Sequence, residues 1–341
     1  MIYKSLGVRG PQVSAIGLGC MGLSGHYEQD LSDNESIKLI QKAFELGITF
    51  FDTADIYGAG HNEKLLGNAF KSILNENRNQ VVIATKCGLD PQDFSVNLDY
   101  KYIIEACTNS LARLNIDYID LYYLHRTSSD LGKFKRALDA LTKLLENNLI
   151  RYIGLSEASV DTINFTYEYF DKLDLLNHFI AVQSEFSLFT QNVKYNEVLR
   201  TCNELGLAFV AYSPLSRALL STKEKMHSDF AFQDGDFRGL LPRFQGDNFK
   251  ANLEIRDSLE RIAINKNCSV PQLALSWLIA QEGSIFPIPG TRKITNLINN
   301  INTLSVKLNQ EDLEQINKIM EQQVMGQRYT EEMVQKQGII E

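Results

Sequence analysis

The chain lacks the features of membrane-spanning and secreted proteins. No apolar run approaches the ~20 residues that a helix needs to cross a bilayer. The N-terminal stretch MIYKSLGVRGPQ carries charge but no apolar segment of the kind found in a secretion signal. The sequence therefore predicts a cytoplasmic protein with no membrane partner.

Cysteine is sparse, and its pattern excludes two kinds of site. The five cysteines lie far apart and form no Cys-x-x-Cys pair, so neither a zinc ribbon nor a dithiol redox motif is expected. The histidines show no His-Glu-x-x-His or comparable ligand spacing. We therefore predict no bound metal, and we expect reduced thiols that mostly pack inertly, including Cys20 and Cys87 near predicted strand ends.

An excess of basic residues is also missing. The chain has 34 Lys and Arg against 42 Asp and Glu, which gives a formal net charge of −8. Nucleic-acid binding requires a basic surface that neutralises phosphates, so nucleic acid is not an expected partner. A local pocket for a small anion remains compatible with this composition.

What the chain does contain is a regular alternation of short apolar segments with amphipathic segments of helical length. The predicted strands cover residues 16–20, 48–53, 80–86, 119–125, 150–156, 178–184, 207–213 and 284–290. The predicted helices cover residues 34–47, 62–74, 100–114, 131–148, 161–173, 195–206, 248–267 and 271–282. Such an α/β pattern gives either a doubly wound open sheet or a closed (β/α)₈ TIM barrel, and eight units favour the barrel, here with extra C-terminal helices.

Three other segments complete this prediction. Residues 1–15 are expected to form a β-hairpin that plugs the base of the barrel, and residues 214–247 a long active-site loop after the seventh strand. The polar C-terminal tail, 322–341, either folds over a ligand or stays mobile. Since no low-complexity linker interrupts the chain, we predict a single domain over residues 1–341.

The hexapeptide GLGCMG, residues 17–22, matches the Gly-x-Gly-x-x-Gly fingerprint of a dinucleotide-binding turn, but its surroundings do not. In a Rossmann fold the helix starts at the third glycine, so that its N-terminus holds the pyrophosphate. Here the polar stretch LSGHYEQDLSD follows Gly22 before a helical pattern begins. We therefore predict that these glycines let a ligand approach the end of the first strand, outside a Rossmann fold.

Polar and ionisable residues follow the predicted strands at their C-terminal ends, where barrel enzymes hold their chemistry. A lone lysine is usually solvated and a lone histidine is usually a satisfied core residue, so the combination carries the interpretation. The residues concerned are Asp52, Tyr57, Lys86, His125, Ser156, Glu157, Gln183, Tyr212, Thr291, Arg292 and Lys293.

Four of these residues together predict a proton donor. A free phenol, with a pKa near ~10, is a weak acid at neutral pH, and a nearby ammonium such as Lys86 is expected to lower the pKa of Tyr57. Asp52 would hold Lys86 charged, and His125 would orient a carbonyl oxygen that Tyr57 protonates. No side chain supplies a hydride, so a nicotinamide cofactor is implied.

These motifs, in this order and spacing, resemble the aldo-keto reductases over nearly the whole chain. The matching segments are FDTADIYG, ATKCG, YIDLYYLHR, IGLSEAS, VQSEFSL, AYSPLSRALL and PIPGTRK. Within the family, GLSE and DFRGLLPRFQGDNF resemble most the branch of pyridoxal reductases and related aldehyde reductases. The resemblance implies a TIM barrel that reduces a small carbonyl substrate, with Tyr57, Lys86, Asp52 and His125 as the catalytic tetrad.

The resemblance also implies how NADP(H) is held across the barrel mouth. Ser156 and Gln183 would bind the nicotinamide carboxamide, and Tyr212 would stack on its ring. Two adjacent cations after a Pro-Gly pair independently indicate an anion site, here for the adenosine 2′-phosphate. The remaining expected cofactor residues are Ser213, Leu215 and Arg217 at the pyrophosphate, and Thr291, Arg292, Lys293 and Asn300 at the 2′-phosphate.

The chain departs from the family pattern at several positions. Ser216 and Ala218 replace glycines of the loop after the seventh strand, and Phe189 stands where the branch commonly has Trp. Two other functions stay open at this stage. Lys86 could form a Schiff base in an aldolase, or the chain could be a non-enzymatic NADP(H)-sensing subunit, as in the reductase-like β-subunits of potassium channels.

Overall fold

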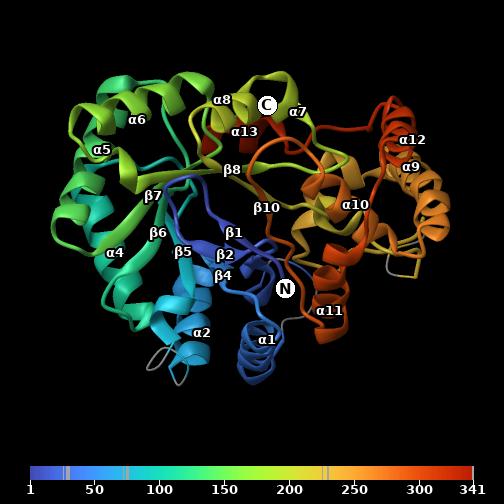
Figure 1. Cartoon of the computed structure of the whole chain (residues 1–341), viewed down its shortest axis with the longest axis horizontal. Helices are drawn as coiled ribbons and strands as arrows, with labels where there is room; N and C mark the ends of the chain where they lie inside the picture. Colours follow the sequence, from blue (N-terminus) through green and yellow to red (C-terminus); the bar gives the residue numbers. More distant parts are fainter. Residues whose placement is uncertain are drawn as a thin grey trace.

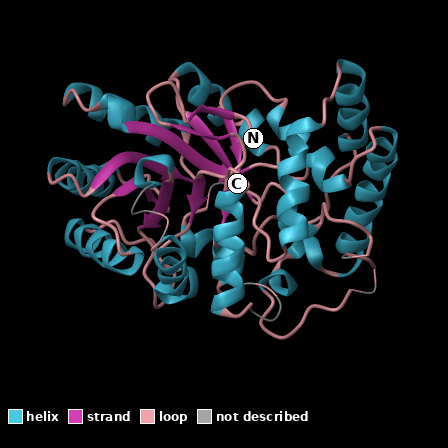
Figure 2. Cartoon of the chain, turned by 60° about the horizontal axis from the view of Figure 1, so that its bottom comes forward, coloured by secondary structure: helices cyan, strands magenta, loops and turns pink. Residues whose placement is uncertain are grey.

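Eight parallel strands curl into a barrel, and helices cover its outer surface (Figures 1 and 2). This is a computed structural model, and it describes residues 1–25, 27, 31–71, 73, 77–224, 226–228 and 230–339. The barrel strands are β3 (Leu18–Gly19), β4 (Phe50–Asp52), β5 (Val82–Cys87), β6 (Ile119–Leu124), β7 (Ile150–Ser156), β8 (Phe179–Glu185), β9 (Ala208–Tyr212) and β10 (Ile285–Pro287).

Each strand pairs in parallel with the next one along the chain, from β3 to β10. The first and last strands meet where the Gly17 amide donates to the Pro287 carbonyl at 3.0 Å. The strands are buried on both faces because their inward side chains fill the barrel and their outward side chains pack against helices. The predicted (β/α)₈ fold is confirmed.

Several of the helices between the strands begin at side-chain caps of the usual kind. The side chain of Ser32 forms a capping box with Glu35, and Asp99, Asp130 and Ser159 each accept backbone N–H groups of the next helix. The helices between the barrel strands include α1 (Asp33–Glu45), α2 (His61–Phe70), α4 (Tyr100–Leu114), α5 (Leu131–Glu146), α6 (Val160–Lys172), α8 (Val198–Glu204), α9 (Gly246–Asn265) and α10 (Val270–Ile279).

The N-terminal hairpin closes the base of the barrel, as predicted. Its strands β1 (Tyr3–Ser5) and β2 (Gln12–Ser14) pair antiparallel. Leu6 and Val13 are fully buried in the apolar cluster that fills the barrel interior. The cluster includes the first residues of β5 and β9, Val82 and Ala208, so the hairpin lies at the end opposite the predicted site.

Extra C-terminal helices were predicted without bounds, and the structure now gives the bounds of these helices and of one further short helix. They are the short α7 (Asn192–Tyr195) and three C-terminal helices, α11 (Ile294–Asn302), α12 (Gln310–Met320) and α13 (Glu331–Gln337). Helices α9 and α12 pack together on the side of the barrel away from α4 and α5 (Figure 1). The predicted helix 62–74, loop 214–247 and tail 322–341 each contain positions outside the described residues.

The described part of the long loop after β9 contains short 3₁₀ turns at Ser216–Ala218, Phe237–Leu240 and Pro242–Phe244. Among the helices of the described residues, none is both long and apolar enough to span a bilayer.

Candidate active site

The four predicted catalytic residues converge at the C-terminal ends of β4, β5 and β6. The Lys86 ammonium donates to Asp52 Oδ1 at 2.5 Å and to the Thr53 carbonyl at 2.7 Å, and its Nζ lies 3.5 Å from the Tyr57 hydroxyl. The Gln183 amide donates to the other Asp52 oxygen at 2.7 Å. Lys86 is thus a held ammonium beside a phenol, in an almost fully buried cluster.

The electrostatic balance at Tyr57 differs from the sequence prediction. Burial raises the pKa of Tyr57, and the opposing charge of Lys86 does not bring the pKa below its ordinary value. The expected net lowering is therefore wrong for the chain without cofactor, because burial cannot be read from strand-end spacing. Burial also favours neutral Lys86, but Asp52 and Tyr57 outweigh it and raise the pKa of Lys86. At neutral pH Tyr57 keeps its proton and Lys86 keeps its charge.

His125 follows β6, and its ring lies edge-on to the Tyr57 ring, with centroids 6.0 Å apart. Burial, then the charges of Arg126 and Lys86, hold the pKa of His125 well below its ordinary value. The imidazole is therefore neutral, and it can hydrogen-bond a polar oxygen without adding charge. Its Nδ1 atom is buried with no hydrogen-bond partner among the described residues.

A groove of about 500 Å³ runs from this cluster across the mouth of the barrel. Most of the residues predicted from the sequence line it. They are Asp52, Tyr57, Gln183, Tyr212, Ser213, Leu215, Arg217, Thr291, Arg292, Lys293 and Asn300. The structure places Lys86, His125 and Ser156 outside the groove lining, and Ser156 is buried in register with Gln183 on the neighbouring strand.

The far end of the groove is basic and lies at the start of a helix. Arg292 and Lys293 immediately precede α11, so two cations and the N-terminus of the helix share one end of the groove. Asn300, on the same helix, also lines the groove and is almost fully buried. Two positive side chains and helix N–H groups are the usual components of a phosphate site.

The glycines of GLGCMG lie beside the groove, and no α-helix starts at Gly22. A Cβ at Gly19 would lie 2.6 Å from the Ile288 carbonyl oxygen, so only glycine fits where the first and last strands meet. Gly19 and Gly22 both line the groove. The next α-helix, α1, begins at Asp33, which agrees with the prediction that this is no Rossmann turn.

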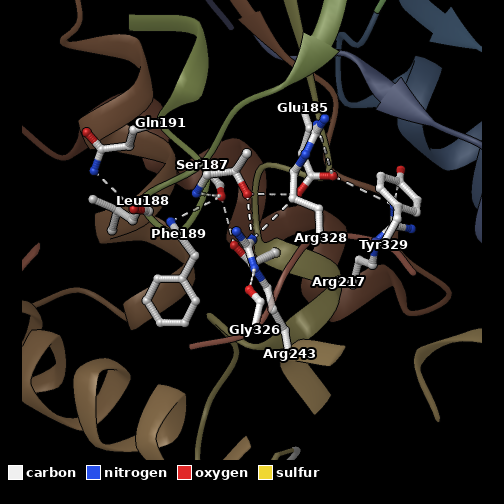
Figure 3. Close-up of polar contacts among 12 residues, drawn as sticks. Glu185, Ser187, Leu188, Phe189, Gln191, Arg217, Arg243, Gly326, Arg328 and Tyr329 are labelled. Carbon is white, nitrogen blue, oxygen red and sulfur yellow. Dashed lines mark hydrogen bonds and ion pairs between the residues drawn. The ribbon is translucent and has the colours of Figure 1, made fainter. Parts of the chain in front are cut away.

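A cluster of arginines and glutamates that the sequence did not indicate lies next to the groove (Figure 3). Glu185, at the end of β8, lies within 3.8 to 3.9 Å of guanidinium nitrogens of Arg217, Arg243 and Arg328. Glu157 accepts from the Glu185 backbone at 3.1 Å and from Arg328 at 3.2 Å. Burial favours a neutral Glu157, but Arg328 and Arg126 outweigh it and lower the pKa of Glu157.

This cluster ties the C-terminal segment to the groove. The Tyr329 hydroxyl accepts from Arg217 at 2.6 Å and lies 3.1 Å from the Tyr212 hydroxyl. Arg243 donates to the Gly326 carbonyl. The Asn252 side-chain amide donates to the Met325 carbonyl and accepts from the Met325 backbone N–H. The first part of the predicted tail is thus folded against the groove.

Comparisons with known proteins agree with this geometry. Residues 15–321 match the model of the aldo/keto reductase family. The chain belongs to the aldo/keto reductase family. It is therefore an oxidoreductase that acts on carbonyl and alcohol groups.

Three relatives illustrate the similarity. A probable aldo-keto reductase 1 of Glycine max is 39% identical over 317 residues, which cover 91% of this chain and 86% of the relative. The glycerol dehydrogenase AKR11B4 of Gluconobacter oxydans superposes with a TM-score of 0.80 at 26% identity, covering 94% of this chain and 95% of that one. The thermostable aldo-keto reductase Tm1743, solved with the inhibitor epalrestat, gives 0.73 at 26% identity, covering 94% and 100%.

This aldo/keto reductase adopts a strained loop where the family pattern has glycines. Ser216, Arg217 and Ala218 have φ values of 49°, 54° and 78°, in the left-handed region that favours glycine. The Ser216 hydroxyl bonds the Ser187 hydroxyl at 2.8 Å, which helps to hold this conformation. The loop reaches the groove despite the two substitutions, since Leu215, Arg217 and Ala218 all line it.

Two of the cysteines near the strand ends are buried in the core of the reductase. Cys20 and Cys87 are fully buried, and burial raises the pKa of both thiols. A protonated, inaccessible thiol is a poor nucleophile, so neither residue is a candidate for the chemistry at the barrel mouth.

Proposed function

We propose that this chain catalyses the NADPH-dependent reduction of an aldehyde or ketone to an alcohol, with Tyr57 as the general acid. The observation that carries the proposal is one continuous groove with a phenol–ammonium–carboxylate cluster at one end and a basic helix start at the other. This arrangement suits a cofactor with a reactive ring at one end and a phosphate at the other.

Residues that line the groove, with Ser156 beside them, fit such a cofactor. Gln183 already donates its amide to Asp52, and together with Ser156 it would bind the nicotinamide carboxamide. Tyr212 would stack on the ring, and Ser213, Leu215 and Arg217 would lie along the pyrophosphate. Thr291, Arg292, Lys293 and Asn300 would hold the 2′-phosphate, which is the basis for proposing NADPH rather than NADH.

The bound cofactor supplies a hydride to the carbonyl carbon. Neutral His125 would donate a hydrogen bond that orients the carbonyl oxygen, and Tyr57 would transfer its phenolic proton to that oxygen as negative charge develops. Lys86 would stabilise the resulting phenolate, because its ammonium is fixed by Asp52 and the Thr53 carbonyl. Solvent would then return the proton to Tyr57.

The substrate is proposed to be an aromatic or pyridoxal-like aldehyde, on the basis of the sequence resemblance to the pyridoxal and aldehyde reductase branch. A Schiff-base aldolase fits less well, since a nucleophilic lysine must lose its proton, whereas Asp52 and Tyr57 raise the pKa of Lys86.

The test is NADPH oxidation by the purified protein against a panel of aldehydes that includes pyridoxal. The proposal predicts turnover with several aldehydes and weaker activity with NADH. Tight NADPH binding with negligible turnover across the panel would contradict it and support the nucleotide-sensing alternative. Covalent labelling of Lys86 by borohydride in the presence of aldehyde would support the aldolase instead.

A further inference from the structure

Glu157 joins the ends of the two strands that are proposed to hold the nicotinamide. Its backbone N–H donates to the Gln183 carbonyl at 2.8 Å. Its Oε1 atom accepts from the backbone N–H of Glu185, the last residue of β8, at 3.1 Å. Since Glu157 directly follows Ser156, the last residue of β7, these two bonds fix the end of β7 against the end of β8.

The conformation of Glu157 needs support from elsewhere in the chain. Its φ value of 50° lies in the left-handed region, which is unfavourable for a residue with a Cβ. Its side chain is almost fully buried, and so is that of Glu185. Two neighbouring buried carboxylates are unfavourable unless a cation pairs with them. The contact between β7 and β8 therefore depends on a positive charge close to Glu157.

Arg328 supplies this charge, although it lies 171 residues from Glu157 along the chain. Its Nη2 atom donates to Glu157 Oε2 at 3.2 Å, and its Nη1 atom lies 3.9 Å from Glu185 Oε2 (Figure 3). The guanidinium is itself buried, so solvent screens the pair little. Arg328 and Glu157 both lie outside the groove lining, so any effect on the groove passes through the strand ends.

The next residue along the chain reaches the other wall of the same pocket. The Tyr329 hydroxyl lies 3.1 Å from the hydroxyl of Tyr212, the residue proposed to stack on the nicotinamide ring. Arg243 holds the start of this segment by donating to the Gly326 carbonyl at 3.2 Å. Residues 326–329 are therefore fixed beside the end of the groove where the ring would bind.

We propose that Arg328 is a positioning residue for the nicotinamide end of the cofactor, acting through Glu157 on the ends of β7 and β8. This inference rests on the proposed NADPH-dependent function and deepens it. The Gln183 amide also donates to Asp52 at 2.7 Å, so the same strand end aligns the ring with the catalytic cluster. A misplacement of about 1 Å can lower the rate of a chemical step by about 100-fold, so a residue outside the groove can control hydride transfer.

The first test compares NADPH with 2′-phospho-ADP-ribose, which keeps the adenosine 2′-phosphate and the pyrophosphate but lacks the nicotinamide. Arg328→Met should raise the dissociation constant for NADPH by about 10-fold and leave that for 2′-phospho-ADP-ribose within about twofold. Isothermal titration calorimetry measures both constants. Equal losses for the two ligands, or no loss for either, would show that Arg328 does not act on the nicotinamide end, and the inference would be wrong.

The second test is single-turnover reduction, at saturating NADPH, of an aldehyde that the wild-type enzyme reduces. Arg328→Met should lower the hydride-transfer rate by about 10- to 100-fold, because the ring is misaligned. Arg328→Lys keeps a cation beside the two carboxylates and should recover most of the rate. An unchanged rate in Arg328→Met would contradict the inference.

Two further variants make the comparison decisive. Glu157→Gln keeps an acceptor for the Glu185 N–H but removes the ion pair, so it should show the same nicotinamide-selective loss even if Arg328→Met does not fold. Arg200→Met removes a guanidinium from an exposed helix and should change neither dissociation constant. If the wild-type chain binds NADPH but reduces no aldehyde, the proposed function fails, and the binding comparison still decides the role of Arg328.

Discussion

Two buried charged clusters flank the groove, and they are built in opposite ways. The catalytic cluster joins Asp52, Lys86 and Tyr57 from neighbouring strand ends, each within a short local motif. The cluster around Glu185 joins strand ends to Arg328 and Tyr329, which come from the far C-terminal segment. Charges carried by short motifs can be recognised in a sequence, whereas an ion pair between distant segments has no local pattern.

Lys86→Met should have the largest combined effect on turnover and stability, and would break the first cluster at its centre. It removes the ammonium that stabilises the Tyr57 phenolate and leaves the buried Asp52 carboxylate unpaired. We expect kcat to fall by about 100- to 1,000-fold and the free energy of unfolding to fall by about 3 kcal/mol. Steady-state kinetics and urea unfolding measure the two effects.

A second substitution separates chemistry from folding. The double variant Asp52→Asn with Lys86→Met removes the unpaired charge and should recover stability without recovering turnover. Recovery of both would remove Lys86 from the proton-transfer step. Lys143→Met, on an exposed helix surface, is the matched control.

Arg292→Ala tests the end of the groove remote from both clusters. Loss of a charged phosphate contact should weaken NADPH binding by about 10- to 100-fold and change NADH binding little. Dissociation constants from fluorescence titration give both values. Equal losses for the two cofactors would place the 2′-phosphate elsewhere.

Asp55, whose backbone N–H donates to the Lys86 carbonyl at 3.2 Å, predicts a pH dependence of stability. Burial and neighbouring Glu63 raise its pKa to about 7, whereas Arg113 and Lys86 oppose them. The folded chain therefore keeps a proton that the unfolded chain releases above about pH 4, so this group lowers stability progressively as the pH rises from about 4 to 7. Asp55→Asn should stabilise the protein by about 2 kcal/mol more at pH 8 than at pH 5.

Chemical denaturation at the two pH values measures this difference. Asp171→Asn, on an exposed helix position, should give the same small change at both. A pH-independent effect of Asp55→Asn would mean that the carboxyl is not protonated in the folded chain.

Tyr329→Phe has the smallest expected effect and probes the second cluster. It removes the hydroxyl that bonds Arg217 and Tyr212 but keeps the ring. We expect the dissociation constant for NADPH to rise by about 3- to 10-fold, with kcat changed less than about twofold. Tyr195→Phe, at an exposed position, controls for the loss of a hydroxyl. An effect on kcat alone would show that the C-terminal segment does not act through cofactor binding.

The parts of the fold that follow local rules were predictable from the sequence. The strand Ile150–Ser156 and the helix Tyr100–Leu114 have the predicted bounds, because an apolar run and an Asp cap define them. Because the C-terminal ends of the parallel strands meet at one end of the barrel, most of the predicted site residues line one groove. The helices after residue 290 were expected only as extra C-terminal helices without bounds, since they pack outside the regular strand–helix alternation.

Two features of the site depended on tertiary structure. The net pKa shift of Tyr57 follows the balance of burial against Lys86, which spacing does not reveal. The partners of Glu157 and Glu185 come from segments far along the chain, so Arg243 and Arg328 gave no signal.

The central claim is that Tyr57 donates the proton during carbonyl reduction. Tyr57→Phe should lower kcat by about 100- to 10,000-fold while leaving the dissociation constant for NADPH within about twofold, because the ring is kept and only the hydroxyl is lost. Single-turnover kinetics with an aldehyde that the wild-type enzyme reduces measures the step directly. Unchanged turnover in Tyr57→Phe would contradict the account.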